Sequence, residues 1–261
     1  MPTRDDVLTE LGLVPTWRLR ARGDVGGAAE AASASAATPA TEAPEAVLVP
    51  VRRARAPEDA ARAARIGGLE WRDFAADVDA CVACGLASTR KQSVPGVGDT
   101  HAEWLLIGEA PGSEEDAKGE PFVGQAGKLL DNMLAALGMK RGENVYIANV
   151  LKCRPPNNRT PEPREVDACR PYLDRQIALI GPKLIVALGK SAATTLLGVD
   201  ATIASLRGRV HRYRGVPLVV TYHPAYLLRN LPDKAKAWED LLLARRTLRG
   251  AAATDAAPAG T

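Results

Sequence analysis

Four cysteines are the residues whose type and spacing most clearly suggest chemistry. Cys81 and Cys84 form a C-x-x-C pair, and Cys153 and Cys169 follow further along the chain. Four thiolates can close one tetrahedral zinc site or hold one iron–sulfur cluster, and the number of thiols does not choose between them. The alternative is a pair of buried thiols beside an unrelated C-x-x-C motif. The cysteines alone therefore predict either a metal site or structural burial.

Several polar residues that could act on a substrate come directly after apolar runs. Glu109 and Glu115 lie in GEAPGSEED, Asn149 falls at the end of VYIANV, and His223 follows PLVVTY. Carboxylates and imidazoles can move protons or position water, and a carboxamide both donates and accepts hydrogen bonds. The common alternatives are a turn residue for Asn149 and a structural residue for His223.

The apolar runs themselves predict the elements that would position these residues. Four runs read as buried strands, at 104–108, 145–150, 184–188 and 217–222. Amphipathic helical patterns lie between them, at 126–138, 163–181 and 190–198. This alternation predicts an α/β fold, a three-layer αβα sandwich with a central, mostly parallel four-stranded sheet. Ligands of such folds bind beyond the carboxyl ends of the strands, where the polar residues lie.

Composition divides the chain into four parts. Residues 1–25 form a short segment whose role the sequence does not reveal, and residues 26–66 are an Ala/Pro-rich stretch that we expect to be a disordered linker. Residues 67–249 carry the folded domain, and residues 250–261 read as a disordered tail.

Composition and net charge argue against a membrane protein but do not distinguish among other functions. The chain of 261 residues is 46% hydrophobic with a formal net charge of +3, which is compatible with DNA binding but equally with many other enzymes. It contains no apolar run long enough to span a bilayer and no secretory signal pattern, so we expect a cytoplasmic protein without a membrane partner. In a reducing compartment the cysteines favour metal binding or burial over disulfides.

Three motifs carry a resemblance to a known family. In order and spacing, GEAPGSEEDAKGEPFVGQAGKLLDNML, NVLKCRPPNNRTPEPREVDAC and YHPAYLLRN resemble the family 4 uracil-DNA glycosylases, over roughly residues 70–248. The resemblance implies a monomeric DNA-repair enzyme that hydrolyses the N-glycosidic bond of deoxyuridine in single- or double-stranded DNA and leaves an abasic site. It also implies a [4Fe–4S] cluster held by Cys81, Cys84, Cys153 and Cys169.

The resemblance assigns roles in a pocket for a flipped uracil. Phe122 would stack on the base, with a core phenylalanine as the alternative, and the Asn149 carboxamide would match the O4 and N3–H edge of uracil while mismatching cytosine. His223 would stabilise negative charge on the departing base. Glu109 and Ala110 would line the pocket, and Glu115 would help to position water. Related families carry aspartate where Ala110 stands, which leaves the water-activating residue open.

Two basic segments are candidates for DNA contact. By resemblance, Tyr226, Leu227 and Leu228 would wedge into the gap left by uracil, and Arg229 would meet phosphate; the alternative is the first turn of the last helix. The segment LRGRVHRYRG at 206–215 carries four arginines that either contact phosphates or lie on a solvated hairpin.

Three other functions compete with the glycosylase. One is a zinc-stapled DNA-binding protein without catalysis. Another is a nuclease in which Glu114, Glu115 and Asp116 bind magnesium. The third is a cluster-bearing relative that becomes covalently trapped on uracil-DNA, but that branch carries a histidine-containing loop, and KCRPPNNRTP contains no histidine.

Overall fold

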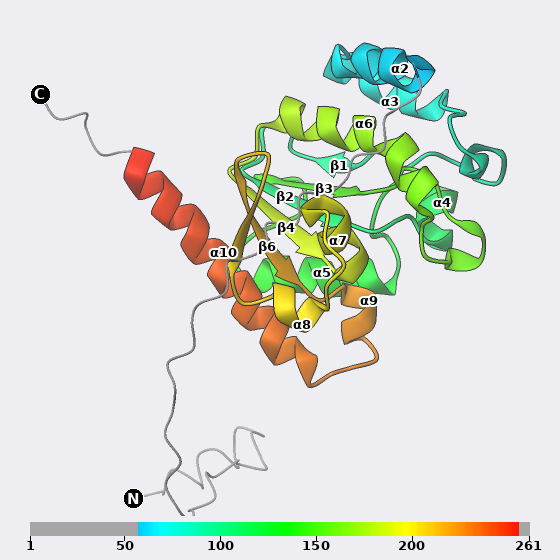
Figure 1. Cartoon of the computed structure of the whole chain (residues 1–261). Coiled ribbons are helices and arrows are strands. Elements are labelled where there is room, and N and C mark those ends of the chain that lie inside the picture. Colours follow the sequence, from blue (N-terminus) through cyan, green and yellow to red (C-terminus); the bar gives the residue numbers. More distant parts are fainter. Residues whose placement is uncertain (1–56, 256–261) are drawn as a thin grey trace, which may run out of the picture. The chain divides into compact units, whose positions relative to one another are not determined.

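The structure is a computed structural model that describes residues 57–255. The predicted N-terminal segment 1–25, most of the predicted linker and the end of the tail lie outside the described residues. Within them, strands and helices alternate around one sheet (Figure 1).

The sheet has six strands within the described range, in the order β1-β3-β2-β4-β6-β5. They are β1 Val97–Gly98, β2 Trp104–Gly108, β3 Val145–Asn149, β4 Leu184–Leu188, β5 Val210–Tyr213 and β6 Val216–Thr221. The four predicted strands are the central ones, β2, β3, β4 and β6; they run parallel, and β2, β3 and β4 are buried throughout. Burial on both faces explains why these strands read as continuous apolar runs.

Two short antiparallel edge strands correct the predicted strand number from four to six. β1 has only two residues, and Gly98 approaches β3 so closely that a Cβ there would lie 2.2 Å from the carbonyl oxygen of Val145. β5 forms a hairpin with β6 through Arg214 and Gly215, both of which have positive φ. Neither edge has the apolar run that identifies a buried strand, so the sequence pattern did not reveal them.

Helices cover both faces of the sheet, which confirms the three-layer αβα prediction. On one face, α6 (Pro163–Ile180), α7 (Lys190–Leu197) and α8 (Ile203–Leu206) pack against alternate strand residues such as Leu105 and Ile107. On the other, α5 (Gln125–Ala136) and α10 (Asp233–Asp255) pack against Trp104 and Leu106. The shorter helices are α4 (Ser113–Lys118), α9 (Pro224–Leu227) and the 3-10 turns η1 (Gly85–Ser88) and η2 (Pro156–Asn158). Within the described range, no helix has the length and apolar character needed to cross a membrane.

Both predicted limits of the folded domain are too narrow. Residues 57–66, assigned above to the linker, belong to α2 (Pro57–Gly67), which packs with α3 (Trp71–Asp79) against α6 (Figure 1). At the other end, α10 continues to Asp255 through residues assigned to the tail. Alanine explains both errors, because it buries little surface and is also the best helix former.

The packing of α2 predicts that it stabilises the domain. Ile66 is fully buried beside Phe74 and Tyr172, so Ile66→Ala should lower the free energy of unfolding by about 2–5 kcal/mol in urea denaturation. Leu231→Ala is the matched control, because Leu231 is 60% exposed and its truncation should cost about 0.5 kcal/mol. Equal losses for the two variants would contradict a core role for α2.

Candidate active site

Three predicted site residues converge at the carboxyl end of the sheet. A Cβ built on Gly108, the last residue of β2, would lie 2.4 Å from Asn149 Oδ1 and 2.6 Å from Phe122 Cζ. Directly after the neighbouring strand β4, a Cβ on Gly189 would lie 2.9 Å from the Cβ of His223. The rings of Phe122 and His223 stack with centroids 5.4 Å apart. The structure thus brings Phe122, Asn149 and His223 together around two glycines.

The Phe122 loop is held in an unusual conformation. Phe122 has a φ of 55°, a region that non-glycine residues seldom occupy, and its side chain is 5% exposed. The Arg141 guanidinium donates to the carbonyl oxygens of Pro121 and Phe122 at 2.9 and 2.8 Å. Gly127 passes so close that a Cβ would lie 1.7 Å from the Phe122 oxygen. Sequence reasoning missed Arg141 because its contacts are to main-chain atoms of a distant loop.

Asn149 places a buried acceptor beside Gly108 and Phe122. Its residue is 2% exposed, and Oδ1 is one of the buried polar atoms that have no hydrogen-bond partner among the described residues. An unpaired buried carboxamide oxygen is costly in the free protein. A ligand N–H donor placed beside Gly108 would satisfy it.

His223 is held as a neutral imidazole. Its Nδ1 accepts a hydrogen bond from the backbone N–H of Ala225 at 3.1 Å, so the proton of the neutral ring lies on Nε2. Burial and, to a smaller extent, the charge of nearby Arg229 lower the pKa of His223 to about 4, while Glu115 opposes the shift. At neutral pH the ring can therefore donate one hydrogen bond without carrying charge.

Glu115 holds two loops of the site together. The resemblance assigns water positioning to this residue, but its carboxylate accepts from the backbone N–H groups of Gly112, Val123 and Gly124 at 2.9 to 3.1 Å. These bonds join the loop after β2 to the loop that carries Phe122. The geometry identifies Glu115 as a positioning residue.

Glu109 and Ala110 lie directly after β2. The main chain after β3 pairs with this segment, since Val150 N donates to the Gly108 carbonyl and Leu151 N to that of Glu109. Burial raises the pKa of the Glu109 carboxyl, while a hydrogen bond with Ser191 opposes the shift. Ala110 is partly buried against the core.

The magnesium-nuclease alternative finds little support in the acidic loop. Asp116 is buried and accepts from the backbone N–H of Lys91 at 2.9 Å, and the Glu115 oxygens are occupied as described. Within residues 57–255, no group of three or more His, Cys, Asp or Glu side chains is arranged to hold a single metal ion.

The four cysteines surround one cavity rather than a point. Cys81, Cys84, Cys153 and Cys169 all line a small cavity of about 20 Å³, with Lys152 and Tyr172 among its other walls. Three of the sulfurs accept N–H donors: Cys81 from Arg62 at 3.2 Å, Cys153 from Arg90 at 3.0 Å, and Cys169 from the main chain of Lys152 at 3.3 Å. N–H donors to cysteine sulfurs stabilise thiolates that bind a metal or cluster. The three donors were missed because nothing in their local sequence marks them.

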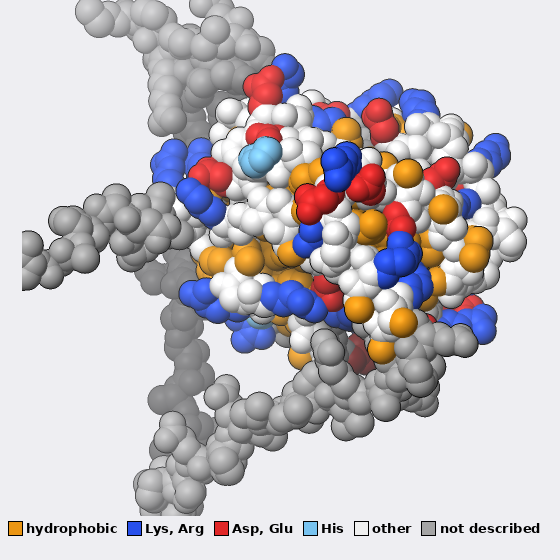
Figure 2. Space-filling view, turned by 90° about the horizontal axis from the view of Figure 1, so that it is seen from above, with side chains coloured by type: hydrophobic (Ala, Val, Ile, Leu, Met, Phe, Trp, Pro, Cys, Tyr) orange, Lys and Arg blue, Asp and Glu red, His pale blue; other side chains and the backbone are white. Residues whose placement is uncertain are grey.

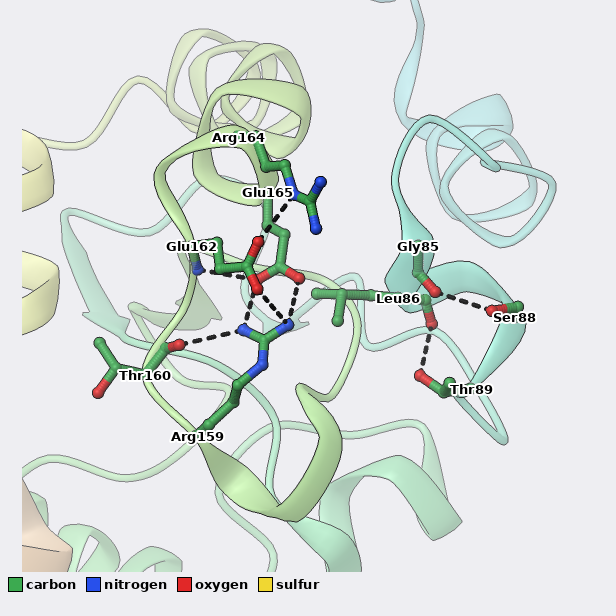
Figure 3. Close-up of polar contacts among 9 residues, drawn as sticks. All are labelled: Gly85, Leu86, Ser88, Thr89, Arg159, Thr160, Glu162, Arg164 and Glu165. Carbon is green, nitrogen blue, oxygen red and sulfur yellow. Dashed lines mark hydrogen bonds and ion pairs between the residues drawn. The ribbon is translucent and has the colours of Figure 1, made fainter.

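A paired arginine fixes the segment between Cys153 and α6. The Arg159 guanidinium bonds both oxygens of Glu165, at 2.6 and 2.9 Å, and also pairs with Glu162 (Figure 3). The Glu165 carboxylate is buried, and its hydrogen bond to Arg159 lowers its pKa. This pair orders the start of the helix that carries Cys169.

The segment after His223 divides into buried and exposed residues. Leu227 is 1% exposed within the core, and the Tyr226 hydroxyl donates to Asp233, so neither is free to insert. Leu228 is 41% and Leu231 60% exposed, and Arg229 is exposed. These contacts do not favour insertion of Tyr226 or Leu227, and Leu228 and Leu231 are the exposed leucines of this segment.

The arginines of residues 206–215 mostly have partners within the domain. Arg207 pairs with Asp240 and Glu239, and Arg214 with Asp174, as expected for a structural hairpin. Figure 2 shows one face of the molecule, over which basic and acidic side chains are interspersed. These contacts favour the hairpin alternative over a phosphate-binding stripe.

Comparison with known proteins places this site in a family. Residues 95–242 match the model of the uracil DNA glycosylase superfamily. The chain is 48% identical to a type-4 uracil-DNA glycosylase of Archaeoglobus fulgidus over 60% of this chain and 82% of that protein, and 44% identical to one of Pyrobaculum aerophilum over 62% and 87%. A type-5 uracil-DNA glycosylase of Pyrobaculum aerophilum is 33% identical over 51% of this chain and 66% of that protein. The chain belongs to the uracil DNA glycosylase superfamily and, within it, to the type-4 uracil-DNA glycosylases.

Proposed function

We propose that this protein hydrolyses the N-glycosidic bond of deoxyuridine in DNA, releasing uracil and leaving an abasic site for base excision repair. The observation that carries the proposal is the unpaired, buried Oδ1 of Asn149, which lies beside the Phe122 ring at the end of the sheet. A flipped base would supply the missing donor and a face for stacking.

Base selection follows from the hydrogen-bonding pattern of Asn149. Its Oδ1 accepts from uracil N3–H while Nδ2 donates to O4. Cytosine has an acceptor at N3 and a donor at its exocyclic amine. The acceptor Oδ1 would then face the acceptor N3, and the donor Nδ2 would face the donor amine. Phe122, fixed by Arg141 and Gly127, would hold the plane of the base.

Departure of the base is assisted by His223. As the glycosidic bond breaks, negative charge collects on uracil, and the Nε2–H of a neutral imidazole would donate to O2. Because Nδ1 is held by Ala225 N, the ring needs no tautomer change before it acts. No proton has to be transferred to a uracil anion, which is a tolerable leaving group.

Water capture is assigned to the loop after β2. Since the Glu115 oxygens are occupied by backbone amides, we propose Glu109 as the carboxylate that faces the sugar and Glu115 as the residue that holds the loop. Ala110 supplies main-chain groups at the position where related families carry aspartate.

We further propose that the four cysteines hold a [4Fe–4S] cluster. The shared cavity and the N–H donors to three sulfurs fit such a group. When bound it would supply cross-links between the segment of Cys81 and Cys84, the loop of Cys153 and helix α6, together with a redox couple that hydrolysis does not require. Zinc in a non-catalytic protein is less favoured, because such a protein has no use for the pocket.

The expected partner is uracil-containing DNA, single- or double-stranded. We propose that the protein acts as a monomer in the cytoplasm, as the sequence predicts. The wedge residues and Arg229 would contact the duplex at the gap left by the base.

Activity is tested with a labelled uracil oligonucleotide in EDTA, beside a thymine control, followed by alkali. We expect alkali-dependent cleavage confined to uracil, and Asn149→Ala should reduce kcat/KM about 100-fold or more because it removes the hydrogen bonds to the base edge. Folded wild-type protein that leaves uracil-DNA intact would overturn the function, and cleavage without alkali would contradict a monofunctional enzyme.

The lowered pKa of His223 predicts a specific pH dependence. Its folded pKa of about 4 lies below the ordinary value of 6.5, so the unfolded chain binds an extra proton between these values. Stability from this group is complete above about pH 6.5 and falls by about 3 kcal/mol toward pH 4. The difference in unfolding free energy between wild type and His223→Gln, measured by urea denaturation across this range, should show that slope. An imidazole that titrates near 6.5 by NMR would contradict it.

The exposed leucines predict a strand-dependent effect. Leu228→Ala and Leu231→Ala should lower excision about tenfold on double-stranded DNA and little on single-stranded DNA, because only a duplex leaves a stacked gap to fill. Val199→Ala, which is also partly exposed but lies after α7, should leave both rates unchanged. Equal losses on both substrates would exclude the wedge role.

A further inference from the structure

A fully buried lysine connects the cysteine cavity with the base pocket. Lys152 is 1% exposed, and its Nζ donates to the carbonyl oxygen of Asn149 at 2.9 Å and to Oε1 of Gln176 at 2.6 Å. The proposed reaction as derived above makes no use of it.

The same residue also touches the cysteine site. Its main-chain N–H donates to Cys169 Sγ at 3.3 Å, and its carbonyl accepts from Val94 N at 2.8 Å. Lys152 lines the cavity together with all four cysteines. Lys152 therefore bridges the two sites with its own atoms.

Gln176 holds the ammonium in place. It is fully buried on α6, and its Nε2 donates to the Pro95 carbonyl at 2.8 Å and to the Tyr146 hydroxyl at 3.1 Å. These bonds leave Oε1 free to accept from Lys152. Gln176 therefore anchors the ammonium on one side, and the ammonium donates its other hydrogen bond to the carbonyl oxygen of Asn149.

Stability alone gives little reason for a lysine at this position. Burying an ammonium is costly even when it is hydrogen-bonded, and an apolar side chain of similar volume usually fills such a position at no loss. The Asn149 carbonyl, at the last residue of β3, is the group that the lysine fixes, and the orientation of that peptide sets where the Asn149 carboxamide lies.

We propose that Lys152 is a positioning residue that couples the cysteine site to base recognition by fixing the main chain of Asn149. The inference rests on the proposed function. A change at the cysteine site would then reach Asn149 through the single residue Lys152.

The test is a double-mutant cycle in the metal-loaded full-length protein. Lys152→Met should lower kcat/KM for uracil-DNA about 10- to 100-fold and weaken inhibition by free uracil to a similar degree, while affinity for a thymine oligonucleotide stays unchanged. In the Asn149→Ala background the same change should cost less than about twofold, because the carboxamide that it positions is gone. Lys140→Met is the matched control, since Lys140 is exposed and pairs with Glu143, and it should leave all three quantities unchanged.

A second readout reports on the cysteine side. Lys152→Met should keep the visible absorption of the bound cluster but move its reduction potential to a more negative value, because a positive charge next to the thiolates is removed. If Lys152→Met does not fold, Gln176→Leu replaces it in the cycle, since it releases the ammonium from its anchor.

The outcomes separate the two proposals. Wild-type protein that does not excise uracil overturns the function itself. Active wild-type protein in which Lys152→Met costs the same factor with and without Asn149, or leaves the reduction potential unchanged, overturns the coupling and leaves the function standing.

Discussion

The site depends on the absence of a side chain at Gly108. Asn149 Oδ1 and the Phe122 ring occupy the space that a Cβ would need there. Phe122 itself adopts a positive-φ conformation that costs about 1–3 kcal/mol. Two charge-assisted hydrogen bonds from Arg141 offset that strain, and the first turn of α5 can pass the loop only because residue 127 is also glycine. The arrangement of Phe122 and Asn149 around Gly108 therefore follows from main-chain contacts.

Acidic residues near the pocket serve mainly to hold it. Glu115 gathers three backbone amides from two loops, and Asp116 takes a fourth from Lys91. Both carboxylates lie in the first turn of α4, where the helix dipole favours negative charge. A carboxylate already saturated by amides is a poor base, so the division of roles between Glu115 and Glu109 follows from hydrogen bonding. Charge alone would not distinguish them.

The sequence predicted the parts of the molecule that local patterns encode. The apolar runs identified the parallel strands, because a strand that is buried on both faces is apolar at nearly every position. The ends of these runs located Asn149 and His223, because ligands of such folds bind beyond the carboxyl ends of the strands. It did not predict β1, β5 or the start of α2, because none of them contains a run of large apolar residues. β1 depends on a close glycine contact, β5 on a hairpin turn, and α2 on an alanine-rich helix. It also missed Arg141 and Lys152, whose partners are distant main-chain oxygens. The exposed fraction of Leu227 and Leu231 depends on how α9 packs, which three-dimensional contacts decide.

The cations around the cysteines make physical sense only if the thiols act as anions. Arg62 and Arg90 direct guanidinium groups at Cys81 and Cys153, and the buried Lys152 lies close enough to Cys169 and Cys153 for these cysteines to affect its pKa. Four neutral thiols would not offset the desolvation cost of a buried ammonium, whereas negatively charged thiolates would attract it. Burial raises the pKa of Cys169 to about 12, so an empty site would hold neutral thiols, whereas ligation to a metal removes the proton and leaves thiolate. In the proposed cluster site the ligated thiolates would supply that negative charge, and Lys152 contacts Cys169 through its main-chain N–H and Asn149 through its ammonium.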